Sequence, residues 1–133
     1  NTFALGMPPG LFAADELAHG IHGGEVETSL LMHLRPDLVR REALRDFESL
    51  GRRMPARGDL LGPEKPVGFG WMIQDLNAAG ACGNAAMADA ERGGKLLEYL
   101  AMQLVAVLHD VAQTPLSILA DGSVPNRCVL PLR

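Results

Sequence analysis

The segment 85–111 has the most regular apolar pattern in the chain, and any fold must accommodate it as one long helix. Its apolar side chains recur three and four positions apart, which is the spacing of one helix face. They are Leu97, Leu100, Ala101, Leu104, Leu108 and Val111. Within this segment, Gly93 and Gly94 each cost about 1 kcal/mol of helix stability relative to alanine. The glycine pair therefore predicts either a kink or the close approach of another backbone.

A second, shorter helix is predicted over residues 24–34. Glu25 and Glu27 lie in its first turn, where acidic side chains interact favourably with the positive end of the helix dipole. Pro36 ends this helix, because the residue before a proline is displaced from the helical region. Apolar residues cover most of its circumference, which predicts a helix that is buried on most sides.

Strands are scarce in the rest of the sequence. Residues 1–5 resemble the end of a strand, and residues 67–76 contain strand-forming side chains between glycines. Residues 51–68, rich in Gly, Pro and Arg, are expected to form an exposed loop. Loops that approach ~20 residues are uncommon inside a compact domain. We therefore predict that the chain is part of a larger layered fold whose other strands come from elsewhere.

Length and charge limit the classes of function. The chain has 133 residues, enough for one domain, and a net charge of −4. Its densest basic groups are the pairs Arg40-Arg41 and Arg52-Arg53, so we expect no clustered basic surface for nucleic-acid phosphates. No apolar run approaches the ~18 residues of a membrane span. The expected protein binds neither nucleic acid nor a membrane.

The two cysteines carry little functional signal. Cys82 and Cys128 lie far apart and outside any CxxC motif, so a zinc site built from them is not expected. A disulfide between them stays open, although a protein of a reducing compartment does not need one. With no signal-peptide pattern at the N-terminus, a cytoplasmic location is the default expectation.

The stretch IHGGEVETSLLM (21–32) places an ionisable ring directly before the shorter helix. The positive end of that helix disfavours an imidazolium, so His22 is expected to be neutral at pH 7, the state that a general base requires. Gly23 and Gly24 lack side chains, so a substrate or a second loop could approach the ring and the free N–H groups of the helix. Glu27 could orient the ring, hold a water molecule or support a metal-bound group.

Simpler roles are open for the same residues. His22 could be a loop histidine that caps the helix, and Glu27 could be an ordinary first-turn glutamate. His19 lies three positions before His22, a spacing that could bind a metal ion, but Gly20 between them weakens the helical turn that this needs. The sequence contains no HExxH, GxSxG, P-loop or GxGxxG motif. It therefore offers one proton-transfer candidate without a complete catalytic set.

Two blocks of the sequence resemble the creatininase family of amidohydrolases. HGGEVETSLLMHLRPDLV (22–39) is similar to the family signature H-[AG]-G-x-x-E-T-S, which an apolar helix and P-x-L-V follow. GWMIQDLNAAGACGNAAMADAERGGKLL (70–97) resembles a second family block ahead of the last long helix. The resemblance spans residues 1–112, and the extended C-terminal tail 113–133 has no counterpart in it.

The resemblance implies an α/β fold, in which residues 1–112 form the C-terminal half of a creatininase-type α/β/α layered domain with a mostly parallel sheet. It also implies a metal-dependent amidohydrolase that hydrolyses an amide, cyclic amide or formamide C–N bond of a small molecule. A homo-oligomer, typically a hexamer, is the implied assembly.

The implied cofactor is a divalent metal, zinc or manganese, bound by E-x-H, Asp and G-H-x-E-N elements of the family's N-terminal half. Those elements are absent from this sequence, so the resemblance assigns it no metal ligand. It instead requires a partner, either that N-terminal half or a separate chain that supplies it.

The resemblance also implies roles for residues of the first block. His22 matches the family's catalytic histidine, which carries a proton from the attacking water to the leaving nitrogen. Glu27 matches the glutamate of E-T-S, which supports the site. The resemblance further implies that the substrate-binding residues include His19, Gly23 and Gly24.

Two functions follow as alternatives. The chain is part of a metal-dependent amidohydrolase and is inactive alone, or it is a non-catalytic half-domain or truncated fragment with a structural or assembly role. The intact HGGxxETS motif favours the enzyme. The missing ligands favour the second function, as does LAHGI (17–21), which stands where creatinine-hydrolysing members resemble G-W-D-x-E-H.

Overall fold

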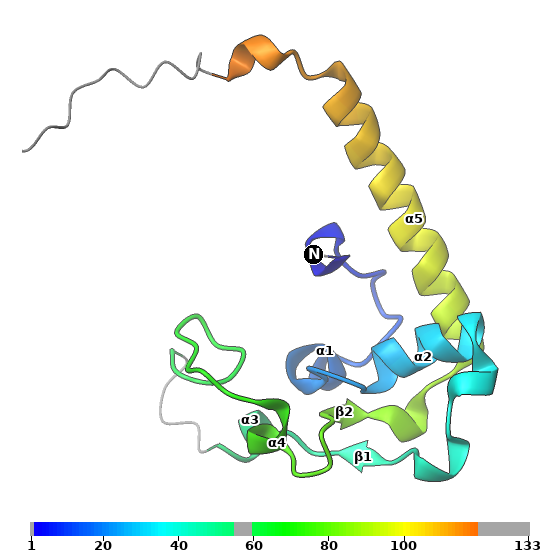
Figure 1. Cartoon of the computed structure of the whole chain (residues 1–133), viewed down its shortest axis with the longest axis vertical. Helices are drawn as coiled ribbons and strands as arrows, with labels where there is room; N and C mark the ends of the chain where they lie inside the picture. Colours follow the sequence, from blue (N-terminus) through cyan, green and yellow to red (C-terminus); the bar gives the residue numbers. More distant parts are fainter. Residues whose placement is uncertain (1, 55–59, 120–133) are drawn as a thin grey trace, which may run out of the picture.

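The computed structural model describes residues 2–54 and 60–119 (Figure 1). Short helices, turns and two strands lie together near the start of the long helix α5 (Ala90–Gln113), which extends away from them. The other α-helices are α1 (Ala14–His19), α2 (Glu25–Leu34), α3 (Leu50–Arg53) and α4 (Ile73–Leu76). The strands are β1 (Asp46–Phe47) and β2 (Gly83–Asn84). The 3₁₀ turns η1 to η5 cover Thr2–Leu5, Pro36–Leu38, Arg41–Ala43, Ala85–Met87 and Leu116–Ile118.

Both predicted helices are present, and a side-chain cap marks the start of the longer one. α2 begins after Gly24 and ends just before Pro36, as predicted. α5 begins at Ala90, later than predicted, because a side-chain oxygen of Asp89 accepts a hydrogen bond of 2.8 Å from the N–H of Glu91. A side-chain cap of this kind satisfies a helix N–H that has no partner within the helix, so it defines the first turn.

α2 and α5 cross at very short range, and the glycine pair of α5 makes this possible. A Cβ atom on Gly93 would lie 1.9 Å from the carbonyl oxygen of Ser29, and one on Gly94 would lie 2.9 Å from the His33 ring. The predicted close approach of another backbone is therefore confirmed. The core joins both helices to the segment before α1 and contains Phe12, Val26 and Leu96, with Met7, Leu11, Leu30 and Leu100 packed against it.

α2 is buried on the side that faces α5 and not around most of its circumference, so that expectation is wrong. Leu31 and Leu34 are 40% and 54% exposed. Thr28 and Ser29 are buried instead. Small side chains are needed where two helix backbones approach closely, and the Ser29 hydroxyl also accepts a hydrogen bond of 3.0 Å from the N–H of Asp89.

The prediction of a strand at residues 1–5 is wrong for residues 2–5, which are the ones that the structure describes. Thr2–Leu5 forms the turn η1, and β1 and β2 make up the sheet found in the described ranges. A strand that pairs with no neighbour leaves its backbone N–H and C=O groups unsatisfied. Strand-forming side chains alone therefore do not make a strand here.

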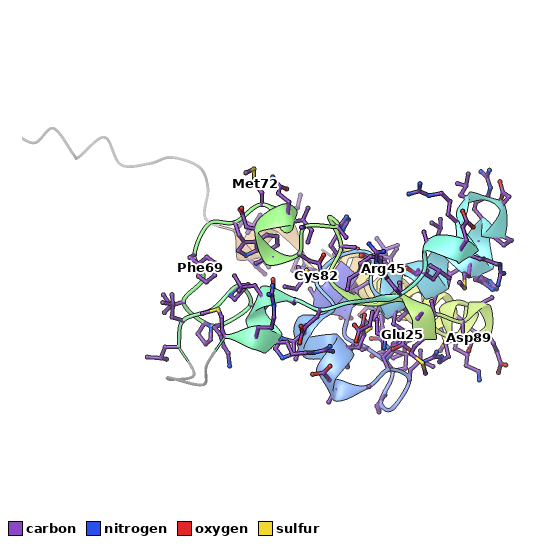
Figure 2. The ribbon with its side chains drawn as sticks, turned by 90° about the horizontal axis from the view of Figure 1, so that it is seen from below. Glu25, Arg45, Phe69, Met72, Cys82 and Asp89 are labelled. Carbon is purple, nitrogen blue, oxygen red and sulfur yellow. The ribbon has the colours of Figure 1, made fainter. Side chains whose placement is uncertain are left out.

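The strand expected within residues 67–76 is also wrong. Val67 is 54% exposed, and Phe69 and Met72 lie at the periphery of the molecule (Figure 2). The end of this segment forms α4, where the side chain of Asp75 accepts a hydrogen bond of 2.8 Å from the N–H of Met72. A bond from the residue before a helix to a side chain of its first turn favours a helical turn over an extended strand.

β1 and β2 pair antiparallel, with Asp46 opposite Asn84 and Phe47 opposite Gly83. This pair and the helices that surround it agree with the predicted α/β class. The mostly parallel sheet of a larger domain stays a prediction, as does the assignment of the chain to the C-terminal half of that domain.

The second half of α5 extends away from the rest of the described chain (Figure 1). It carries an exposed row of apolar side chains. These side chains are Met102, Leu104, Val105, Val107, Leu108 and Val111. Within the described ranges, none of the helices combines the length and apolarity needed to cross a bilayer. Most of the predicted extended tail, residues 120–133, lies outside the described residues.

Candidate functional site

The loop that carries His22 joins α1 to α2 and is tied to the segment before β2. The His22 N–H donates a hydrogen bond of 3.2 Å to the carbonyl oxygen of Cys82, and the Cys82 N–H donates one of 2.7 Å to the carbonyl oxygen of His22. These bonds form an antiparallel bridge between the two sequence blocks. Only backbone atoms of His22 are used, and its side chain is left 61% exposed.

His22 and Glu27 face each other at the entrance of α2. Nδ1 of His22 lies 3.6 Å from Oε2 of Glu27, an electrostatic contact that is longer than a hydrogen bond. The same Glu27 oxygen accepts a hydrogen bond from the N–H of Gly23, which fixes the carboxylate against the loop. The hydroxyl of Thr28 donates a bond of 3.3 Å to the carbonyl oxygen of Gly23. The structure therefore brings together the two residues that the sequence nominated as catalytic.

The residues nominated for the substrate side occupy different surroundings. Gly23 adopts φ +64°, a left-handed conformation that favours glycine. Gly24 is buried, and a Cβ on it would lie 2.3 Å from a carboxylate oxygen of Glu16, so atoms of the chain itself occupy the space beside it. His19 ends α1 and is half-buried, with Nδ1 3.6 Å from the position of a Cβ on Gly51 in α3.

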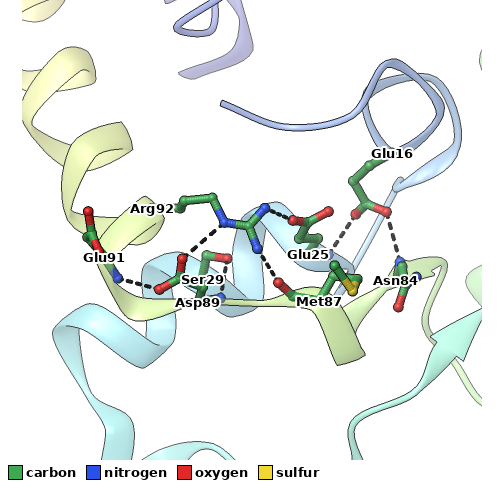
Figure 3. Close-up of polar contacts among 8 residues, drawn as sticks. All are labelled: Glu16, Glu25, Ser29, Asn84, Met87, Asp89, Glu91 and Arg92. Carbon is green, nitrogen blue, oxygen red and sulfur yellow. Dashed lines mark hydrogen bonds and ion pairs between the residues drawn. The ribbon is translucent and has the colours of Figure 1, made fainter. Parts of the chain in front are cut away.

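Glu16 is a residue of this region that the sequence reasoning missed. It lies on α1 and is 3% exposed. Its Oε1 accepts a hydrogen bond of 2.6 Å from the N–H of Glu25, and its Oε2 accepts one of 2.8 Å from the N–H of Asn84 (Figure 3). One carboxylate thereby joins α1, α2 and β2. Both partners are backbone atoms, so no motif of side-chain types could have revealed the contact.

Arg92 joins the start of α5 to α2 beside this site (Figure 3). Its guanidinium pairs with the buried carboxylate of Glu25, and its Nε lies 3.1 Å from Oδ2 of Asp89. It also lies over the ring of Phe12, with Cζ 5.6 Å from the ring centre. The hydrogen bond from Glu91, followed by the contact with Arg92, lowers the pKa of the Asp89 carboxyl. These contacts secure the helix whose entrance carries His22.

The described residues do not assemble a metal centre. Within residues 2–54 and 60–119, no group of three or more His, Cys, Asp and Glu side chains is placed so that it could hold a metal ion. Cys82 is a buried free thiol, and burial raises its pKa, so it is not a ready thiolate ligand. The donor set at the loop, His22 with Glu27, suits proton transfer.

Comparison with known families decides the relationship of this chain. The sequence profile of the creatininase family, described as creatinine amidohydrolase, matches residues 2–108. The chain belongs to the creatininase family. This confirms the relationship that the two sequence blocks indicated, and the matched range includes the His22 loop, α2 and most of α5.

Two solved structures are similar to the chain. One is a Bacteroides fragilis protein whose name places it among the creatinine amidohydrolases, with 29% identity and a TM-score of 0.67 over 87% of this chain. The other is a creatinine amidohydrolase (creatininase), with 21% identity and a TM-score of 0.57 over 86% of this chain, a likeness that concerns the fold alone. The chain spans 43% and 42% of the length of these two proteins. No curated protein sequence matches it.

Proposed function

We propose that this chain contributes the proton-transfer residue of an amidohydrolase that cleaves a C–N bond in a small molecule. The observation that carries the proposal is the contact of His22 with Glu27, on an exposed loop at the entrance of α2. Membership of the creatininase family supports the reaction class. An amide, a cyclic amide or a formamide is the substrate class that follows from this.

The geometry of the pair assigns a role to each ring nitrogen of His22. Oε2 of Glu27 faces Nδ1, which favours the tautomer with its proton on Nδ1 and leaves Nε2 as the acceptor. Nε2 takes a proton from the attacking water and delivers it to the departing nitrogen, so that no amide anion has to leave. Glu27 stabilises the imidazolium that exists between these two transfers, while the N–H of Gly23 holds the carboxylate in place.

The proposal requires groups that the described residues do not provide. Enzymes of the creatininase family are generally metal-dependent, and no group of potential ligands is assembled in the described ranges. Ligands for zinc or manganese are proposed to lie on the remainder of the domain, in an N-terminal half or a separate chain.

The exposed row on α5 supports the existence of such a partner. A contiguous apolar surface on a protein is typical of an interface with another element. The chain also spans less than half the length of its structural neighbours. Assembly into a homo-oligomer, a hexamer by resemblance, belongs to the same proposal.

The test is turnover by the protein isolated with whatever polypeptide copurifies from its native source. A panel of cyclic amides, linear amides and formamides is incubated with the assembly, and released amine is quantified before and after treatment with a chelator. We expect C–N cleavage that the chelator abolishes and added zinc or manganese restores. Turnover should also be lost in His22→Ala. His109→Ala is the matched control for that variant, because His109 lies near the far end of α5, bonded to Gln113, and its replacement should leave turnover unchanged.

A structural or assembly role is the second candidate. It is favoured by the exposed apolar row on α5 and by the lack of a metal-ligand group among the described residues. This alternative predicts an assembly that forms normally and hydrolyses none of the panel. Absence of turnover from a metal-loaded assembly would therefore replace the enzymatic proposal with the structural one.

A further inference from the structure

One buried carboxylate lies against three glycines of the backbone around His22. Glu16 lies on α1, and a Cβ atom added to Gly20, Gly24 or Gly83 would lie 2.2, 2.3 or 2.6 Å from its Oε1. Gly20 and Gly24 are the second residues before and after His22. Gly83 follows the residue whose backbone pairs with that of His22. The loop therefore folds around this carboxylate, and only residues without a side chain fit next to it.

The hydrogen bonds of Glu16 hold two of these segments directly. Oε1 accepts the N–H of Glu25, the first residue of α2, and Oε2 accepts the N–H of Asn84 in β2. A carboxylate at the start of a ten-residue helix also interacts favourably with the helix dipole. In the described part of the chain no cation pairs with Glu16, so backbone N–H groups satisfy both of its oxygens.

We propose that Glu16 is a positioning residue for His22: its buried carboxylate fixes the loop from Gly20 to Gly24 against β2 and thereby sets the placement of the His22 ring beside Glu27. Glu16 acts through the backbone and touches no reacting atom. The inference rests on the proposed function only for the importance of His22, and its structural content stands independently of any turnover.

The test compares Glu16→Gln with the unmodified full chain by NMR. Glutamine keeps the size of the side chain, but its NH₂ group replaces one carboxylate oxygen. Two donors then face each other, so the hydrogen bond from the N–H of either Glu25 or Asn84 is lost. We expect the amide protons of Glu25 and Asn84 to move upfield. The amides of the His22–Cys82 bridge should exchange with solvent about tenfold faster or more, because one hydrogen bond to a charged group is lost.

Two readouts separate positioning from a general loss of stability. Amides in the middle of α5 should keep their exchange rates in Glu16→Gln, whereas a general loss would speed them equally. Contacts between the His22 ring and Glu27, seen as nuclear Overhauser effects, should weaken in Glu16→Gln. They should persist in Glu98→Gln, a matched substitution at an exposed position of α5.

The unmodified chain alone can overturn the inference if the variant does not fold. Its Glu25 and Asn84 amides should be protected from exchange with solvent, because both donate to the buried carboxylate of Glu16. Amides that exchange as fast as those of exposed loops would contradict the role of Glu16. Inactivity of the assembled protein with these NMR results intact would reject the proposed function and leave the positioning role in place.

Discussion

Replacement of Gly93 by alanine should destabilise the fold through one atom. The added Cβ would lie 1.9 Å from the carbonyl oxygen of Ser29 and 2.4 Å from its carbonyl carbon, and helix backbone cannot rotate out of the way. Overpacking against rigid atoms costs about 3 kcal/mol, the upper end of the usual range. Alanine recovers about 1 kcal/mol of helix propensity. The net loss is about 2 kcal/mol, and at about 4 °C per kcal/mol the Tm should fall by about 8 °C.

Gly94→Ala is the matched control, because it makes the same chemical change one residue further along the same helix. Its Cβ would meet the ring of His33 at 2.9 Å, and that exposed side chain can rotate away. Thermal unfolding of both variants, followed by circular dichroism at 222 nm, should show a lower Tm for Gly93→Ala and an equal or higher Tm for Gly94→Ala. Equal shifts in the two variants would refute the close crossing of α2 and α5.

Three further predictions concern single residues. In a Cys128→Ser background, Cys82 should react with a thiol reagent at neutral pH only as fast as the chain unfolds, because its thiol is buried and burial raises its pKa. Rapid labelling of the folded protein would contradict this prediction. The Asp89 carboxyl has a pKa below its ordinary value of 3.8, so its contribution to stability should be present above that value and lost as the pH falls through the lower pKa of the folded state. The Tm difference between wild type and Asp89→Ala should therefore shrink over that pH range. A constant difference would count against the cap. Gly23→Ala should lower stability by about 1 kcal/mol in urea unfolding, because its φ of +64° is unfavourable for alanine, and an unchanged midpoint would show that the loop relaxes.

The helices could be predicted from the sequence because their signals are local. The three- and four-residue spacing marks α5, and the Glu-rich first turn with a following proline marks α2. The glycine pair indicated either a kink or the close approach of another backbone, and the structure shows the close approach. The strands could not be predicted, because β1 and β2 are two residues each and exist only through pairing between Asp46–Phe47 and Gly83–Asn84. The two apolar segments that looked like strands join no sheet in the described ranges, although Val67 forms an isolated parallel bridge with Leu61.

The candidate site likewise has one part that could be predicted from the sequence and one part that could not. His22 and Glu27 lie close in sequence across a helix start, so their chemistry could be inferred from residue types and spacing. The hydrogen bond that the N–H of Asn84 donates to Glu16 spans 68 positions, and the pair of Glu25 with Arg92 spans 67. Such contacts depend on the tertiary fold, and Glu16 stands in a short acidic stretch that resembles an ordinary exposed helix face.

We propose that His22 transfers a proton for C–N cleavage and does not hold a metal. The decisive measurement is kcat together with bound metal, determined by elemental analysis, for His22→Ala and wild type in the same assembled protein. We expect a kcat about 10²- to 10⁴-fold lower at an unchanged metal content, because general acid–base catalysis contributes a factor of that order. Parallel losses of metal and of activity would contradict it and would make His22 a ligand.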